Sequence, residues 1–104
     1  MLRSPRHLKP NGRKLYRDLV SEYQITDAAG LALVTTACEC LDRMRAAQVA
    51  IEQHGEVVTD RYGQVKVNPA ATLEKDSRAG MLAALKALNL DLEPLKEIGR
   101  PPGR

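Results

Sequence analysis

A run of 30 residues without proline, from Thr26 to Gly55, places the strongest constraint on how this chain can fold. Thr26 or Asp27 can cap the start of a helix, because a short side-chain oxygen accepts a hydrogen bond from a free backbone N–H, and Gly55 suits the left-handed position just past the end. Apolar residues recur every three or four positions between these caps, as one face of a helix requires. The residues of this stripe are Leu31, Val34, Cys38, Leu41, Met44 and Ile51, with Gln48 in the one polar position.

The length of this helix also predicts a partner for it. At about 1.5 Å per residue it would be roughly 40 Å long, more than a compact chain of this size covers. We therefore expect part of it to pack against a second long helix or against another chain.

The composition indicates one small domain with an aliphatic core. The chain has 104 residues and contains neither Trp nor Phe, so its core must come from Leu, Val, Ile, Ala and Met. No apolar run approaches the roughly 18 residues of a membrane span, and residues 1–10 lack the apolar region of a signal peptide. The expected location is therefore the cytoplasm, with no membrane partner.

Cys38 and Cys40 are two positions apart on a helix and point in nearly opposite directions, which predicts reduced packing residues and no disulfide.

Residues 1–10 are expected to form a basic N-terminal arm, and residues 11–95 a single helical domain. Asn11 can cap a short first helix whose apolar face includes Leu15, Leu19 and Val20. Residues 96–104 combine glycine, proline and arginine, which predicts a flexible tail. Together these segments predict a mainly α fold: a short and a long helix forming a hairpin, a small β-hairpin, a second long helix and the tail.

The β-hairpin is expected near residues 56–67. The β-favouring runs 57–59 and 65–67 flank a turn in which Gly63 occupies the position that needs a positive φ. An isolated hairpin is marginally stable in water, so we expect it to pair with strands of a neighbouring subunit or to lie against the helices. Asn68 and Pro69 then open the last helix, as its cap and its first residue. Gly80 within that helix predicts a close helix crossing.

The basic residues of the N-terminal part predict contacts with nucleic-acid phosphates. Six of them precede the first acidic residue, Asp18, and such a cluster raises affinity for a phosphate backbone without reading base sequence. The alternative interpretation is a solvated leader that only increases solubility. The predicted DNA-binding residues are Arg3, Arg6, Lys9, Arg13, Lys14 and Arg17.

No catalytic or metal-binding pattern is found in the sequence. It contains no Gly-rich phosphate loop ending in Gly-Lys-Ser/Thr, and its two histidines, His7 and His54, are solitary. We therefore predict no catalytic residue, no metal ligand and no cofactor, and a protein that is not an enzyme.

The order of several short segments is more specific than any one of them. These are Tyr23-x-x-Thr26-Asp27, Cys38-Glu39-x-x-Asp42, Gly55-x-Val57, Asp60-x-x-Gly63, Asn68-Pro69 and Leu88-Asn89-Leu90-x-x-x-Pro94. From about Leu8 to Pro94 the chain resembles the small terminase subunit family of tailed phages and prophages. The resemblance implies a non-catalytic protein that forms a homo-oligomeric ring and binds double-stranded viral DNA at the packaging site. It also implies that this protein regulates a separate large terminase subunit, the ATPase and nuclease. By the same resemblance, Gly55, Gly63, Asn68 and Pro69 mark the hairpin and its exit as structural residues.

The far end of the long helix is the expected subunit contact. In this interpretation Leu31, Val34, Cys38 and Leu41 pack within the chain, while Ala46, Ala47, Ala50 and Ile51 meet a neighbouring copy. A charge at Ala47 or Ala50 should then break the assembly without unfolding the monomer. The C-terminal tail is the candidate contact with the large subunit.

Two other functions are compatible with the residues. A dimeric helix-turn-helix-like regulator would use the corner at residues 24–26, but its second helix should be basic, whereas residues 28–40 contain one acidic and no basic residue. A structural adaptor with no nucleic-acid role would use the basic leader only for solubility.

Overall fold

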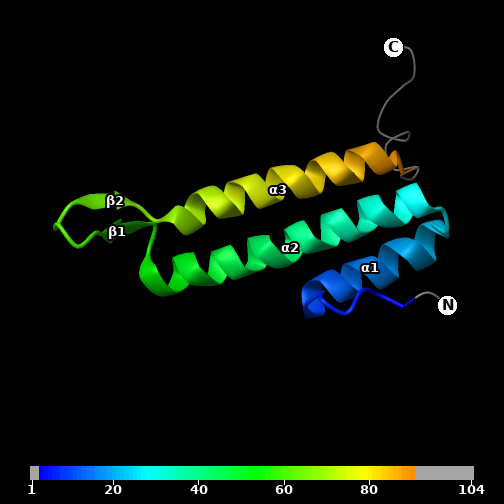
Figure 1. The fold of residues 1–104 in the computed structure, drawn as a ribbon, viewed down its shortest axis with the longest axis horizontal. Helices are drawn as coiled ribbons and strands as arrows, with labels where there is room; N and C mark the ends of the chain where they lie inside the picture. Colours follow the sequence, from blue (N-terminus) through cyan, green and yellow to red (C-terminus); the bar gives the residue numbers. More distant parts are fainter. Residues whose placement is uncertain (1–2, 91–104) are drawn as a thin grey trace, which may run out of the picture.

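The computed structural model describes residues 3–90 and confirms the predicted mainly α fold. The elements are α1 (Pro10–Tyr23), α2 (Ala28–His54), β1 (Val57–Thr59), β2 (Val65–Val67) and α3 (Pro69–Leu88). Figure 1 shows α2 and α3 running side by side in opposite directions, with α1 against the other side of α2 and the hairpin projecting from the far end. The predicted tail, residues 96–104, lies outside the described residues. Within residues 3–90, no helix is both long enough and apolar enough to cross a membrane.

The two ends of α2 have local causes in the sequence. Asp27 is the N-cap, and its side chain accepts a hydrogen bond of 2.9 Å from the backbone N–H of Gly30. At the other end Gly55 has φ 86°, and its N–H donates to the carbonyl of Ile51 at 2.7 Å. The absence of proline between these caps lets 27 residues form one uninterrupted helix.

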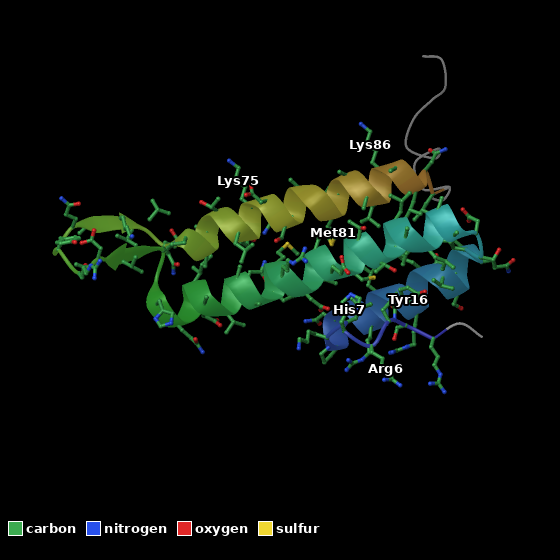
Figure 2. All side chains as sticks on the ribbon, in the orientation of Figure 1. Arg6, His7, Tyr16, Lys75, Met81 and Lys86 are labelled. Carbon is green, nitrogen blue, oxygen red and sulfur yellow. The ribbon has the colours of Figure 1, made fainter. Side chains whose placement is uncertain are left out.

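α2 buries two faces where the sequence predicted one stripe. Val34 and Cys38 are fully buried in a core cluster with Leu8, Tyr16 and Ile25 from the leader, α1 and the corner before α2. Figure 2 shows Tyr16 on the α1 side of α2 and Met81 on the α3 side. The second buried face of α2 comprises Ala37, Cys40, Met44 and Ala47. A helix between two others has to bury both sides. Small residues such as alanine and cysteine can fill the second side, but they add little to the hydrophobic periodicity of the sequence.

The α2–α3 contact is close because its facing residues are small. A Cβ atom built on Gly80 would lie 2.9 Å from Cys40 Sγ, which confirms the close crossing predicted from this glycine. Gln48, the polar residue of the α2 stripe, donates from Nε2 to Glu74 Oε2 at 3.2 Å. This bond, together with the ion pair to Arg78, lowers the pKa of Glu74 below its ordinary value.

Asn68 joins the hairpin to both long helices. Its Oδ1 accepts a hydrogen bond of 2.9 Å from the N–H of Ala70 at the start of α3, and its Nδ2 donates to the carbonyl of Gly55 at 2.8 Å. Asn68 is buried, and Pro69 is the first residue of α3. A single side chain thus connects the end of α2 with the beginning of α3.

The hairpin presents an apolar face to solvent. β1 and β2 pair antiparallel, with Val57 opposite Val67 and Thr59 opposite Val65, so these four side chains lie on the same face. The valines on this face are 54% (Val57), 70% (Val65) and 62% (Val67) exposed. Gly63 at the turn has φ 81°, where a side chain would strain the backbone. Within the described chain this face remains open to solvent.

The predicted cap of α1 is wrong. The helix begins at Pro10 with Lys9 as its N-cap, and Asn11 is an exposed residue in the first turn. Lys9 has no side-chain acceptor, so its side chain makes no capping bond. The cap of α1 is supplied instead by a residue of α2.

Candidate nucleic-acid interface

The six predicted DNA-binding residues belong to the leader and to α1. Five of them are exposed and Arg13 is half-buried. Figure 2 shows Arg6 on the side of the molecule away from α3, whereas Lys75 and Lys86 project from the outer side of α3. The cluster therefore faces solvent on the α1 side of the molecule.

Two of the six residues have partners within the chain. Arg13 Nη1 donates to the carbonyl oxygen of Leu8 at 2.5 Å. Lys14 Nζ pairs with Asp18 Oδ2 at 2.7 Å, an exposed i,i+4 ion pair of the kind that contributes little to stability. In the part of the chain that the structure describes, Arg3, Arg6, Lys9 and Arg17 have no side-chain ion pair or hydrogen bond. These four cations remain available for phosphates.

The leader is held against the helices by a buried leucine. Leu8 is 1% exposed and belongs to the core cluster, although it precedes the first helix. Its N–H donates to the carbonyl of Pro5 at 3.3 Å, and its own carbonyl accepts the bond from Arg13. Arg6 and Lys9 flank this anchor, so their backbone positions follow from the packing of Leu8.

Asp42 of α2 caps the start of α1. Its Oδ2 accepts a hydrogen bond of 2.7 Å from the N–H of Lys9, and its Oδ1 accepts one of 2.8 Å from the N–H of Gly12. These are two of the backbone donors that a helix start leaves free, and the carboxylate also lies at the positive end of the helix dipole. A Cβ atom on Gly12 would lie 2.4 Å from Asp42 Oδ2. Glycine at this position is therefore what lets the carboxylate approach.

A groove between the leader and α2 adds one exposed cation of that helix to the surface and carries charges of both signs. This open groove of about 250 Å³ is lined by leader residues and by one turn of α2. His7 Nε2 of the leader donates to Glu39 Oε2 of α2 at 2.7 Å, and Arg43 of α2 is exposed. The lining residues are His7, Leu8, Lys9, Glu39, Asp42, Arg43 and Ala46.

Asp42, Gly12 and Arg43 were not predicted as parts of this surface. The signals available in the sequence were Pro10 with no capping residue before it and a glycine in the first turn of a short helix. These signals show that a cap is missing locally. They do not identify the residue of another helix that supplies it.

The sulfur chemistry is that of packing residues. Both cysteines are free and buried. Burial, followed by the nearby charges of Asp42 and Glu39, raises the pKa of Cys38 to about 12. At neutral pH this thiol is protonated and therefore a poor nucleophile or metal ligand. Among residues 3–90 no group of three or more His, Cys, Asp or Glu side chains could hold a metal ion.

The predicted subunit-contact residues fall in different environments. Ala46 is exposed and Ala50 and Ile51 are half-buried, whereas Ala47 is only 2% exposed. Ala47 follows Cys40 by seven residues and so lies on the face of α2 that meets α3. The expectation of a subunit contact at Ala47 therefore needs correction, because this residue packs within its own chain.

The fold and this surface define a class: a small mainly α protein with a projecting β-hairpin and a cluster of exposed cations on the α1 side. Within that class, the family described as "Phage terminase, small subunit" matches residues 12–101. The match covers most of the chain, and the protein belongs to the phage terminase small subunit family. No curated protein and no solved structure matches the chain significantly.

The family match divides the cationic residues into two groups. Arg13, Lys14 and Arg17 lie within the matched range, whereas Arg3, Arg6 and Lys9 precede it. The small subunit is generally the non-catalytic component of a terminase. The three cations of the leader therefore lie outside the range matched by the family.

Proposed function

We propose that this protein is the DNA-recognition subunit of a phage packaging machine. It binds double-stranded DNA through Arg3, Arg6, Lys9, Arg13, Lys14 and Arg17, assembles into a homo-oligomeric ring and regulates a separate large terminase subunit that carries the ATPase and nuclease. The observation that carries DNA binding is a set of four exposed cations, Arg3, Arg6 and Lys9 on the leader anchored by Leu8 and Arg17 on α1, whose side chains have no ion pair or hydrogen bond within the described residues. Membership of the small subunit family supports the role in packaging.

The expected binding is electrostatic and depends strongly on salt. Each phosphate that a protein cation neutralises releases counterions, so log K falls with log salt at a slope of about −0.9 per phosphate. Arg3, Arg6, Lys9 and Arg17 together predict a slope of roughly −3 to −4 for each protomer engaged. This surface provides affinity and register. It does not by itself select a base sequence.

A pair of matched double variants tests this surface. Arg6→Ala/Lys9→Ala and Lys75→Ala/Lys86→Ala each remove two positive charges, from the leader and from the opposite side of the molecule respectively. Binding to labelled duplex DNA is measured by fluorescence anisotropy over a range of salt concentrations. The leader variant should lose about tenfold or more in affinity and about 2 in slope, whereas the α3 variant should keep the slope. Equal effects of the two variants would contradict a leader-based site.

Self-assembly is supported by the surfaces that the protomer leaves open. The hairpin exposes Val57, Val65 and Val67 on one face, and both edges of its two-stranded sheet are unpaired within the described chain. Such a hairpin is marginal alone and is stabilised by a further strand or an apolar surface. We place the subunit contact at this face and at Ala46, Ala50 and Ile51 on the neighbouring end of α2.

The dimeric helix-turn-helix-like regulator has no specific observation in its favour. It would require a base-reading second helix, and α2 contains no Lys or Arg from Ala28 to Asp42.

Regulation of the large subunit is tested directly by measuring the ATPase rate of that subunit with and without this protein. A rate that does not change at any ratio of the two proteins would contradict the regulatory part of the proposal.

A further inference from the structure

We infer that Asp42 is a positioning residue for DNA binding: although it is an acid, it builds the cationic surface by fixing the leader onto α2. The inference rests on the proposed DNA binding and adds to it a residue that lies on the long helix. Its two carboxylate oxygens each accept a backbone hydrogen bond, from Lys9 at 2.7 Å and from Gly12 at 2.8 Å.

Asp42 caps the start of α1, which no side chain of the first turn of that helix does. α1 has no acidic residue in its first turn, and its N-cap, Lys9, makes no side-chain cap. No side chain of the first turn of α1 accepts a hydrogen bond from the free N–H groups of that turn. Asp42, which lies 30 or more positions further along the chain, accepts two of these bonds. The missing Cβ atom of Gly12 clears the approach, since a methyl group there would lie 2.4 Å from Oδ2.

The contact brings together cations from two elements. Lys9 is bonded through its own backbone N–H, so its side chain begins from a point fixed on α2. Arg43 follows Asp42 directly and lines the same groove as Lys9. Arg6 lies two residues before Leu8, the buried anchor of this leader. Asp42 thereby fixes the backbone of Lys9 on the turn of α2 that carries Arg43, and Leu8 keeps Arg6 beside them, so that contacts to phosphates can set the register of the protein on DNA.

Positioning and simple electrostatics predict opposite signs for the loss of Asp42. If its charge acted only through space, its removal would strengthen DNA binding, because a negative group would leave the surface. If Asp42 positions the leader, its removal should weaken binding even though the net charge becomes more positive. The direction of the change therefore identifies the role.

The test compares three variants with a charge control. Asp42→Ala removes both acceptors, Asp42→Asn keeps one amide oxygen, and Gly12→Ala keeps the charge but displaces the carboxylate. Asp18→Asn is the control, because it also removes one negative charge, from an exposed residue of α1 that pairs with Lys14 in the described chain. Each full-length variant is measured for affinity to the same labelled duplex DNA at two salt concentrations. Hydrogen exchange at the amides of Lys9 and Gly12 is measured alongside.

The expected results follow from the loss of the cap. Asp42→Ala and Gly12→Ala should bind DNA about 3- to 10-fold more weakly, with faster exchange at Lys9 and Gly12 and unchanged protection in α2 and α3. Asp42→Asn should recover part of the affinity, and Asp18→Asn should bind as tightly as the unaltered protein or more tightly. If Asp42→Ala fails to fold, Gly12→Ala and Asp42→Asn still decide the question.

Two further outcomes separate this inference from the proposed function. Faster amide exchange at Lys9 and Gly12 with unchanged or tighter DNA binding would overturn the positioning role and leave DNA binding intact. Absence of salt-dependent DNA binding by the unaltered protein would overturn the proposed function and this inference with it.

Discussion

Gly80 and Cys40 fix how closely the two long helices approach. A glycine in the middle of a helix costs about 1 kcal/mol of stability relative to alanine. The close packing of α2 against α3 at Gly80 offsets this cost. The Cys40 sulfur occupies the space that a methyl group on Gly80 would need. The two residues should therefore be energetically coupled.

A double-mutant cycle tests this coupling. Gly80→Ala alone should lower the free energy of unfolding by about 1 kcal/mol, because overpacking of 1–3 kcal/mol outweighs the gain in helix propensity. In the Cys40→Ala background the same substitution should be neutral or stabilising, since the sulfur is gone. Urea unfolding of the four proteins measures the difference. Equal stabilisation by Gly80→Ala in both backgrounds would refute the steric account.

Cys38 makes the free energy of unfolding depend on pH in the alkaline range. Its thiol has a pKa near 9 when unfolded and about 12 in the folded protein, so between these values only the unfolded state releases the proton. Its stabilising contribution is complete below pH 9 and is lost as the pH rises. The free energy of unfolding should fall by about 1.4 kcal/mol per pH unit in this window through Cys38 alone. The slope should be shallower by that amount in Cys38→Ala, measured by urea unfolding from pH 8.5 to 10.5. Identical slopes would mean that the folded thiol ionises normally.

At the scale of elements, α1 and α3 begin in different ways. α3 carries its cap in its own sequence, since Asn68 precedes Pro69, and the pair could be recognised without the structure. α1 begins with the same proline signal at Pro10 but relies on Asp42 from another helix. The expectation of Asn11 as cap assumed that the capping residue lies nearby in the chain.

This contrast explains how far the sequence could predict the molecule. The kinds and order of the elements follow from local signals: the caps at Asp27 and Asn68, the glycine at 55 and the β-favouring runs. The second buried face of α2 consists of small residues and gives no clear periodicity, so it required the tertiary structure. The cationic side chains were predictable as a cluster by their charge. The hydrogen bonds from Lys9 and Gly12 to Asp42 were not predictable, because they join residues about 30 positions apart.

Asn68 should contribute more to stability than an ordinary helix cap. Asn68→Ala removes the cap bond to Ala70 and also leaves the carbonyl of Gly55 without its donor. We expect a loss of about 1–3 kcal/mol in the free energy of unfolding. Asn68→Ser retains a capping oxygen and loses the Nδ2 donor without placing a charge against the Gly55 carbonyl, so it should cost less. Thermal and urea unfolding compare the two, and an equal cost would show that the cap contributes nothing.

At the scale of the whole molecule, the two ends have different properties. The end at α1 is cationic and held together by buried and capped contacts. The other end is a short hairpin with an apolar face and two open strand edges. In the proposed function, the α1 end binds DNA and the hairpin end contacts neighbouring copies.

Polar substitutions on the hairpin face test self-assembly. Val57→Thr/Val67→Thr keeps the β-branched shape and the cross-strand pair but replaces two methyl groups by hydroxyls. The mass in solution, by native mass spectrometry or light scattering at two salt concentrations, should fall from a closed species of several copies toward the monomer. Helix content by circular dichroism should not change. An unchanged mass would move the contact away from this face.

The two alanines at the end of α2 provide a matched pair. Ala50→Glu should reduce the mass in solution and leave the fold intact, because Ala50 is half-buried. Ala47→Glu should instead unfold the protomer, since it places a charge at a residue that is 2% exposed against α3. Circular dichroism and mass measurements on both variants separate the two effects. Similar behaviour of the two would contradict the separation of inner and outer faces.

The contact between Asp42 and α1 also has a consequence in time, during synthesis on the ribosome. α1 is made before the residue that caps it, which is added about 30 positions later. At about 5–20 residues per second this is a delay of roughly 2–6 s. A helix of 14 residues is marginal alone in water, so during this interval the leader and α1 are an unfolded cationic segment. The leader and α1 thus acquire their folded arrangement only once the long helix has followed them.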